Sequence, residues 1–240
     1  MSAVIARVPS RQGQPELEVV VATTQAEQRA LFRLRYDIYV RKMGLLALDH
    51  AFVQDDQLVD PYDAWSTNLL LRANGVPAGS IRFTERRNGP LEIDQYTDAS
   101  ARCPAPMGTL EVTRFMVRRD LHTGRASPLL LYAMWKLLSR STSHTILAAG
   151  KLGKLGQYYK NVCAAGLTVA PTPFEYGLTG CKYELLIANI GRLGSPRRLV
   201  WRAHIQALAL MTFQLTPIGS RVVKRGTRGL PTAQSPLLSS

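Results

Sequence analysis

The sequence contains no run of 18 or more apolar residues, which argues against a transmembrane helix. Residues 1–16 also lack the continuous apolar segment of a signal peptide. We therefore expect a soluble, cytoplasmic protein. With 240 residues, of which 46% are hydrophobic, the chain is long enough to bury one sizeable core.

Cysteine is scarce and the common catalytic motifs are missing. The 3 cysteines, Cys103, Cys163 and Cys181, form no CxxC pair and no metal-type cluster with the 4 histidines, so we expect reduced thiols and no metal site. There is no G-x-S-x-G elbow, no Walker A run and no H-E-x-x-H motif. These absences argue against the commonest serine hydrolases, nucleotide hydrolases and zinc proteases.

Acidic residues are absent from residues 191–240, which contain eight lysines or arginines. This basic extension would attract nucleic acid, an anionic membrane surface or an acidic protein. It has no zinc-finger or RNP pattern and few aromatic residues, so the last two partners are favoured over nucleic acid. A solvated extension without function is the alternative. Within it we expect an amphipathic helix at 199–215 and disorder beyond Pro217.

The start of the chain predicts a flexible arm, a strand and a capped helix. Residues 1–16 are aperiodic, and residues 17–22 are β-branched and apolar. Thr24 and the glutamate three residues later form a capping box at the start of a helix, and Gly44 is its predicted end. The helical spacing places Arg35 on a half-buried face, one turn before an aromatic residue.

The remaining pattern predicts an α/β fold. An acidic loop at 45–65 leads to two apolar runs, 67–72 and 78–84, which Asn-Gly joins as a hairpin. Further elements are expected as a strand at 109–117, a helix from Ser127, a strand at 145–149, a helix at 151–165 and strands at 168–175 and 182–189. The order β-α-β-β-β-α-β-α-β-β indicates a sheet with both faces covered, within one domain at 17–190.

Six charged residues fall at positions that should belong to the core. They are Arg35, Asp60, Asp63, Arg82, Glu111 and Arg114. Buried charges are costly unless paired, so this set suggests an ion network that lines a cavity. A structural salt-bridge cluster is the alternative.

Strict alternation in the strand at 109–117 divides its side chains between two faces. One face would carry Leu110, Val112, Arg114 and Met116. The other face would carry Glu111, Thr113, Phe115 and Val117.

Four segments resemble the N-acyl-homoserine lactone (autoinducer) synthases and the N-acyl amino acid synthases of the GNAT superfamily. They are LRYDIYVRKMG (34–44), VDPYD (59–63), VPAGSIRFT (76–84) and LEVTRFMV (110–117). The lactone synthases usually have Trp where Leu45 stands and Glu where Leu58 stands. These departures favour the N-acyl amino acid synthase branch. The resemblance implies a GNAT-like acyltransferase fold, with a central, mixed but mostly antiparallel sheet flanked by helices.

The resemblance also implies a reaction, in which a fatty acyl group moves from a thioester to an amine. The donor would be acyl carrier protein or coenzyme A, as a co-substrate and without a tightly bound cofactor. The acceptor would be an amino acid or a related small amine. An acidic carrier protein would suit the basic surface of the chain, and the basic extension could also make peripheral membrane contact.

Site residues follow from the same resemblance. Glu111 would be the general base, with Arg114 beside it, and backbone amides near Phe115 and Met116 would stabilise the oxyanion. Val117 would belong to the same acyl site. Substrate charges would be held by Arg35, Asp60, Asp63, Arg82 and Thr113. Phosphopantetheine or the carrier would contact Arg118, Arg119, Gly124, Arg125 and Ala126, although Leu121 stands where coenzyme A-binding members often have Gln or Arg.

Three alternatives remain open at this point. A lactone synthase would additionally use S-adenosylmethionine and release methylthioadenosine. A peptide-lipidating acyltransferase would use a larger amine. A non-catalytic basic module would keep the fold and bind nucleic acid or membrane through the extension.

Overall fold

The structure is a computed structural model. It describes residues 3–11, 13–46, 50–99, 103, 106–118, 125–143, 145–151, 167–169, 173–176 and 181–190. The predicted helix at 199–215 and the basic extension as a whole lie outside these residues, as does the predicted helix at 151–165 apart from Lys151, which ends a strand.

A nine-stranded sheet forms the centre of the described part of the chain. Along the sheet the strands are β1 (Val4–Val8), β2 (Leu17–Val21), β5 (Thr67–Ala73), β6 (Val76–Glu85), β7 (Thr109–Val117), β8 (Thr145–Lys151), β11 (Cys181–Asn189) and β10 (Phe174–Tyr176), with β9 (Leu167–Val169) also paired to β11. Every pair of strands is antiparallel except β7 and β8, which run parallel. The sheet is therefore mixed and mostly antiparallel, as predicted.

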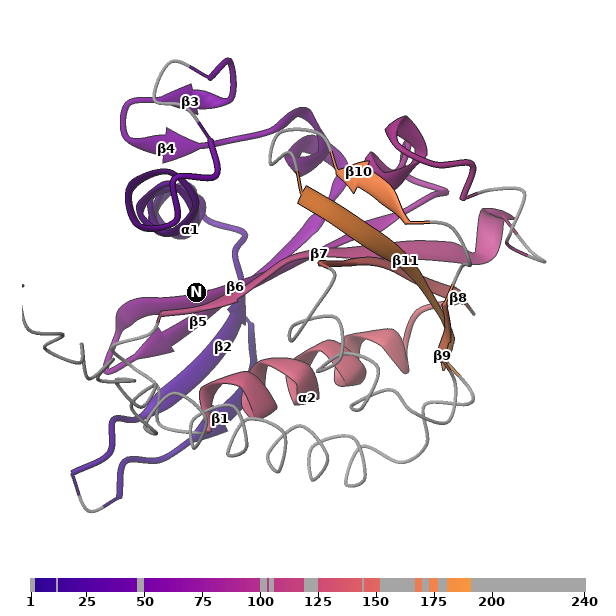
Figure 1. The fold of residues 1–240 in the computed structure, drawn as a ribbon. Helices are drawn as coiled ribbons and strands as arrows, with labels where there is room; N and C mark the ends of the chain where they lie inside the picture. The colour runs from indigo at the N-terminus through magenta and orange to yellow at the C-terminus, as the bar shows by residue number, and fades with distance from the viewer. Residues whose placement is uncertain are drawn as a thin grey trace, which may run out of the picture.

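One helix covers each face of the sheet (Figure 1). The first, α1 (Gln25–Tyr36), begins at the predicted capping box and continues as a π-helical turn, Asp37–Lys42. Its apolar side packs on the inner strands β2 and β5. The second, α2 (Ala126–Leu138), packs on the opposite face against β1, β2 and β6. Neither helix has the length and apolar character that a membrane span requires.

The acidic loop predicted at 45–65 has structure of its own in its described part. The strands β3 (Val53–Gln54) and β4 (Gln57–Leu58) form a small hairpin beside α1, and a short 3-10 helix follows at Pro61–Trp65. Two more 3-10 turns, Glu92–Gln95 and Pro106–Gly108, lie between β6 and β7.

Alternation along the inner strands sorts side chains between the two faces. Leu69 and Leu71 of β5 join the core under α2, whereas the intervening Leu70 joins the cluster under α1. On β6, Ile81 and Phe83 likewise face α2. The charged and polar residues that alternate with Ile81 and Phe83 consequently face α1, on the opposite side of the sheet.

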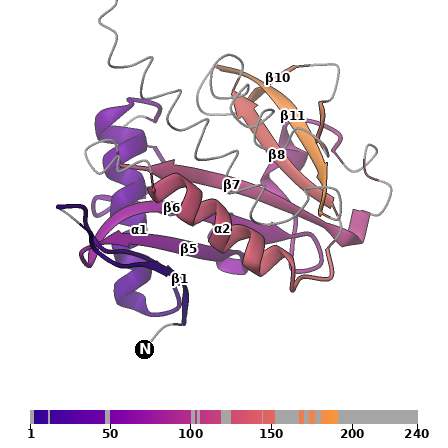
Figure 2. The ribbon, with the colours of Figure 1, turned by 90° about the horizontal axis from the view of Figure 1, so that it is seen from below.

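Strands β7 and β8 separate partway along their length. Their ladder has three pairs and ends at Glu111 opposite Leu147, although β7 continues to Val117 and β8 to Lys151. β8 pairs with β11 along its whole length, and Figure 2 shows these two strands turning away from β7. Glu111 thus lies where the sheet divides.

Two predictions about the strands are corrected by the structure. The flexible arm expected at 1–16 is wrong for Val4–Val8, because β1 pairs with β2 and Lys136 of α2 donates a hydrogen bond to the carbonyl oxygen of Ile5 (2.9 Å). The strand expected at 168–175 is two short strands, β9 and β10.

Candidate active site

Six charged side chains from five parts of the chain meet on the α1 face of the sheet. Arg35 comes from α1, Asp60 and Asp63 from the 3-10 helix after β4, Arg82 from β6, Glu92 from the turn after β6, and Arg114 from β7. Glu111 of β7 lies next to them. We call these seven residues the charged cluster.

Arg35 is fully buried and is held by two partners. Its Nη1 donates to both carboxylate oxygens of Asp63, at 2.7 and 2.9 Å, and its Nη2 donates to Oδ1 of Asn68 at 2.5 Å. Asn68 in turn donates from Nδ2 to Asp63, at 3.2 Å. The bidentate geometry fixes the guanidinium plane as well as its position.

Arg82 is also fully buried and links three elements. Its Nη1 donates to Asp60, its Nη2 to Glu92, and its Nε to Oγ1 of Thr113 at 2.9 Å. Its guanidinium carbon lies 5.5 Å from the ring centroid of Tyr62, within cation–π range. Removing either carboxylate would leave a buried cation short of a partner.

Arg114 shares the same two carboxylates. Its Nη2 donates to Oδ2 of Asp60 at 2.7 Å and to Oε1 of Glu92 at 2.9 Å. Asp60 and Glu92 therefore each bridge Arg82 and Arg114, so the acids and arginines form one connected network.

The spacing of the two aspartates has a local explanation. Asp60 caps the 3-10 helix Pro61–Trp65, since its Oδ1 accepts from the backbone N–H of Tyr62 at 3.1 Å. Asp63 reaches back and accepts from the backbone N–H of Asp60, also at 3.1 Å. Two acids three residues apart thus form a capping box, and each turns its second oxygen toward an arginine.

Arg114 reaches the cluster because β7 contains a β-bulge. Between Thr113 and Met116 of β7 there are two residues, but between their partners on β6 there is only one. Arg114 has a backbone φ of +53°, which is uncommon for a residue other than glycine. The extra residue lets Thr113 and Arg114 point to the same face.

The bulge corrects the face assignment predicted for this strand. Strict alternation separates Arg114 from Glu111 and Thr113, whereas the structure brings all three to the charged cluster. Phe115 and Val117 lie on the other face and pack against the α2 core. Met116 returns to the α1 face, where it contacts the apolar cluster under that helix.

Glu111 lies under the cluster with no exposed surface. Its two carboxylate oxygens accept from the backbone N–H groups of Glu92 (2.8 Å) and Ile93 (3.0 Å). Burial and the negative charge of Glu92 raise the pKa of Glu111 to about 8, although Arg82, the backbone donors and Arg114 oppose the rise. A carboxyl with this pKa changes protonation close to neutral pH.

The rest of the cluster is balanced in charge. Three guanidinium groups face the three carboxylates of Asp60, Asp63 and Glu92. The pKa of Asp60 falls to about 2 although burial alone would raise it, because Arg114, Arg82 and Arg35 favour the charged form. Within the described residues, no group of three or more His, Cys, Asp or Glu side chains is placed to hold a metal ion.

The predicted phosphopantetheine or carrier contacts are separate from the cluster. Arg118 donates to the carbonyl oxygen of Pro77 (3.4 Å), and Ala126 begins α2 with its side chain in the core. Arg125, just before α2, donates to Oε1 of Gln14 and to the carbonyl oxygen of Pro9, at 2.6 and 3.0 Å. A pocket of about 480 Å³ lies here, lined by Val8, Pro9, Arg11, Gln14 and Arg125. Arg119 and Gly124 lie outside the described residues.

Sequence reasoning missed Glu92 and Asn68. Glu92 comes from an irregular, proline- and glycine-containing stretch that gives no periodic signal. Asn68 lies on β5 two residues before Leu70, on the same face, and a buried amide there could have been noticed as a polar residue in an apolar strand.

The fold has counterparts among solved structures. BjaI, a CoA-dependent acyl-homoserine lactone synthase solved with SAM and isopentyl-CoA, superposes with a TM-score of 0.58 at 18% identity, covering 79% of this chain and 87% of BjaI. FeeM, an N-acyl amino acid synthase from uncultured soil microbes, gives 0.57 at 16%, covering 75% and 94%. The AHL synthase LasI gives 0.55 at 15%, covering 78% and 94%. No protein-family model and no curated protein sequence matches the chain. The predicted acyltransferase-type fold is confirmed.

Proposed function

We propose that this chain is an N-acyltransferase that moves a fatty acyl group from a thioester to the amine of an amino acid or a related small amine. The proposal rests mainly on the position and the raised pKa of Glu111. Glu111 lies where β7 and β8 separate, inside a charge-balanced cluster, and its pKa is raised to about 8. The shared fold with enzymes of acyl transfer supports this assignment.

The pKa of Glu111 suits proton removal from an amine. Attack on a thioester requires the acceptor nitrogen to lose its protons, and a general base works best when its pKa lies near the operating pH. An ordinary carboxylate, with a pKa near 4.5, would be a weak base for this purpose. Because Glu111 has no exposed surface, we assign the transfer to a bridging water.

The arginines and the other acids act as a frame for this base. Asp60, Asp63 and Arg82 are already committed to partners inside the cluster, so their proposed contribution is to hold Arg114 and Glu92 in place. A preorganised charged frame costs no reorganisation when charge develops in the transition state. In the proposal, Arg35 and Thr113 extend this frame into α1 and β7.

The thioester would lie along β7 beyond Glu111. The bulge takes the β6–β7 ladder out of register at Arg114 and Phe115, and β8 has by then turned away. The backbone amides near Phe115 and Met116 are assigned to the oxyanion, for which one donor is often worth ~3 kcal/mol. The phosphates of a coenzyme A or carrier thioester would approach the start of α2, where Arg125 and Arg11 line the pocket.

The direct test is product formation. The purified chain would be given decanoyl-CoA or decanoyl-carrier protein with a panel of amino acids and simple amines, and N-acyl products would be identified by mass spectrometry. The proposal predicts an N-acyl amino acid in at least one mixture. Methylthioadenosine release on adding S-adenosylmethionine would instead identify a lactone synthase. The proposal would be contradicted if, in every mixture, the thioester were only hydrolysed or were not consumed at all.

A further inference from the structure

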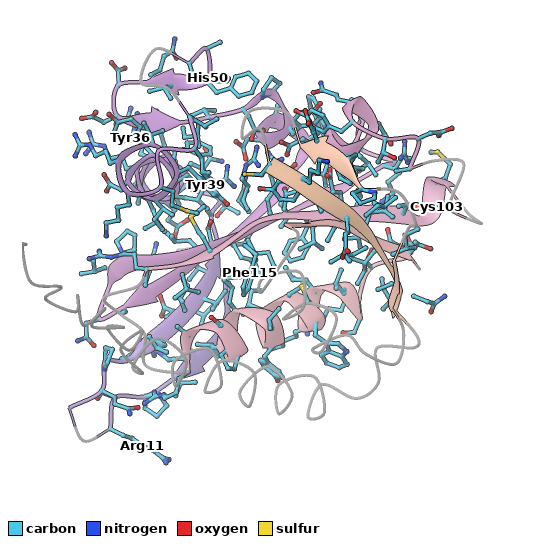
Figure 3. All side chains as sticks on the ribbon, viewed as in Figure 1. Arg11, Tyr36, Tyr39, His50, Cys103 and Phe115 are labelled. Carbon is cyan, nitrogen blue, oxygen red and sulfur yellow. The ribbon has the colours of Figure 1, made fainter. Side chains whose placement is uncertain are left out.

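Tyr39 lies beside the charged cluster, where Arg35, Arg114 and Glu92 act on its hydroxyl. It comes one helical turn after Arg35, in the π-helical turn Asp37–Lys42 that extends α1. Its side chain is partly buried on the apolar cluster under α1. Figure 3 shows Tyr39 on the side of the helix toward the centre of the molecule, whereas Tyr36 lies on the other side.

The π-helical turn sets the direction of this side chain. The backbone N–H of Met43 bonds to the carbonyl oxygen of Ile38 five residues earlier, at 2.9 Å. A π-helical turn is less stable than a continued α-helix and occurs often at functional sites. The turn ends at Lys42, and Gly44 follows two residues later with a φ of +58°, which favours glycine.

Two arginines are the strongest charged neighbours of the Tyr39 hydroxyl. Burial raises the pKa of Tyr39, so the phenol stays protonated and is a hydrogen-bond donor at neutral pH. Arg114 and Arg35 each lower the pKa of this hydroxyl more strongly than Glu92 raises it. A donor in a positive local field is suited to an anion and opposes an ammonium group.

Donors near this point lack acceptors. The Tyr39 hydroxyl makes no hydrogen bond within the part of the chain that the structure describes. Nε of Arg35, on the same helical face one turn earlier, is buried and also has no hydrogen-bond partner there. Buried donors are normally satisfied, so an acceptor is expected to join them when the site is filled.

We propose that the Tyr39 hydroxyl donates a hydrogen bond to the carboxylate of the acceptor, so that the enzyme selects an α-amino acid over an amine without a carboxylate. This inference rests on the proposed acyl transfer. The charges of the cluster are paired with one another, so the donors left to receive a carboxylate are the Tyr39 hydroxyl and Nε of Arg35. The Tyr183 hydroxyl on β11 also acts electrostatically on the Tyr39 hydroxyl.

The test compares two phenol deletions on the same helix. Tyr39→Phe removes the proposed donor. Tyr36→Phe removes a hydroxyl on the other side, where the ring packs with Val40 and Leu58 and lies 5.1 Å from the guanidinium carbon of Arg41. Calorimetry would measure the binding of leucine and of its decarboxylated amine, isopentylamine, and likewise of phenylalanine and phenethylamine. No thioester would be present, so the result does not depend on turnover.

The wild type and Tyr36→Phe are expected to bind an amino acid at least ten times more tightly than its amine. Tyr39→Phe should lose about 10- to 100-fold in affinity for the amino acid and little for the amine, as for a lost hydrogen bond to a charged group. In turnover assays the loss should appear in KM. A preference kept by Tyr39→Phe, or absent from the wild type, would overturn the inference. A fall in the kcat of Tyr39→Phe with every acceptor would also overturn it. That result would mean that the Tyr39 hydroxyl donates a proton to the leaving thiolate. Failure of the proposed function would give a different result, because the protein would then bind the amino acid but form no acyl product.

Discussion

The pKa of Glu111 is set by two opposing influences. Burial and the neighbouring Glu92 disfavour its charge, while two arginines and two backbone donors favour it, and the outcome is a pKa of about 8. The backbone donors also fix the carboxyl in one orientation, with N–O distances of 2.8 and 3.0 Å. A group that is both fixed and able to titrate near neutral pH is suited to catalysis.

Replacing Glu111 by Gln should reduce acyl transfer by ~10²–10⁴, because the amide cannot accept the proton. Turnover would be measured by mass spectrometry of the N-acyl product, with thermal melting as a check on folding. Glu85→Gln, on the adjacent strand and paired with Arg87, is the matched control and should leave turnover near the wild-type value. Equal turnover in Glu111→Gln and the wild type would remove Glu111 from the role of base.

At the same scale, sequence reasoning identified six members of the cluster, because arginines and acids at core positions of helices and strands are rare. It could not find Glu92, whose position depends on how an irregular stretch folds back over β7. It also assigned substrate charges to Asp60 and Asp63, which stays a prediction, and it did not foresee that both acids accept hydrogen bonds from arginines. The pairing of acids with arginines depends on the three-dimensional arrangement of the side chains, which the residue types alone do not reveal.

At the scale of elements, β7 was predicted with its observed ends, Thr109 and Val117, and α1 with its capping box. The bulge and the π-helical turn were not predicted. Each inserts an irregularity into a periodic element, and a periodic pattern read residue by residue contains no signal for it. Arg114 gives no hint either, because the backbone conformation it adopts is one that usually selects glycine.

The bulge leads to a paired prediction. Arg114→Ala and Arg114→Gly both remove the ion pairs, so both should be less stable than the wild type. Glycine tolerates the φ of +53° without a Cβ penalty, so Arg114→Gly should be the more stable of the two by ~1 kcal/mol. Urea unfolding at pH 7 measures the difference. A Gly variant less stable than the Ala variant would argue against the left-handed conformation.

At the scale of the whole molecule, the charged cluster ties α1, β5, β6, β7 and the segments between them into one network. The α/β class and the hairpin could be predicted from the sequence, because periodicity and Asn-Gly are local signals. The strand order, the parallel pairing of β7 with β8 and their separation could not, since they depend on which distant strands meet. These unpredicted features place Glu111 at the point of division.

The network should contribute to acid sensitivity. The pKa of Asp60 is about 2 in the folded state, below its usual 3.8, so its stabilisation is present above pH 4 and lost as pH falls toward 2. Asp60→Asn should therefore lower the free energy of unfolding at pH 7 by about 3–5 kcal/mol, and the gap to the wild type should narrow at pH 3. Asp56→Asn, at an exposed residue, is the control and should change little. A gap that stays constant with pH, measured by urea unfolding, would contradict this account.

The pH dependence of acyl transfer tests the central claim most directly. Glu111 must be ionised to accept a proton, and its pKa is raised to about 8, so kcat/KM should rise as pH increases from 6 and level off above an apparent pKa near 8. The residual activity of Glu111→Gln should lack this rise, once ionisation of the acceptor amine is allowed for with two amines of different pKa. A wild-type profile that is flat across this range, or one that keeps the same rise in Glu111→Gln, would contradict the assignment of Glu111 as the base.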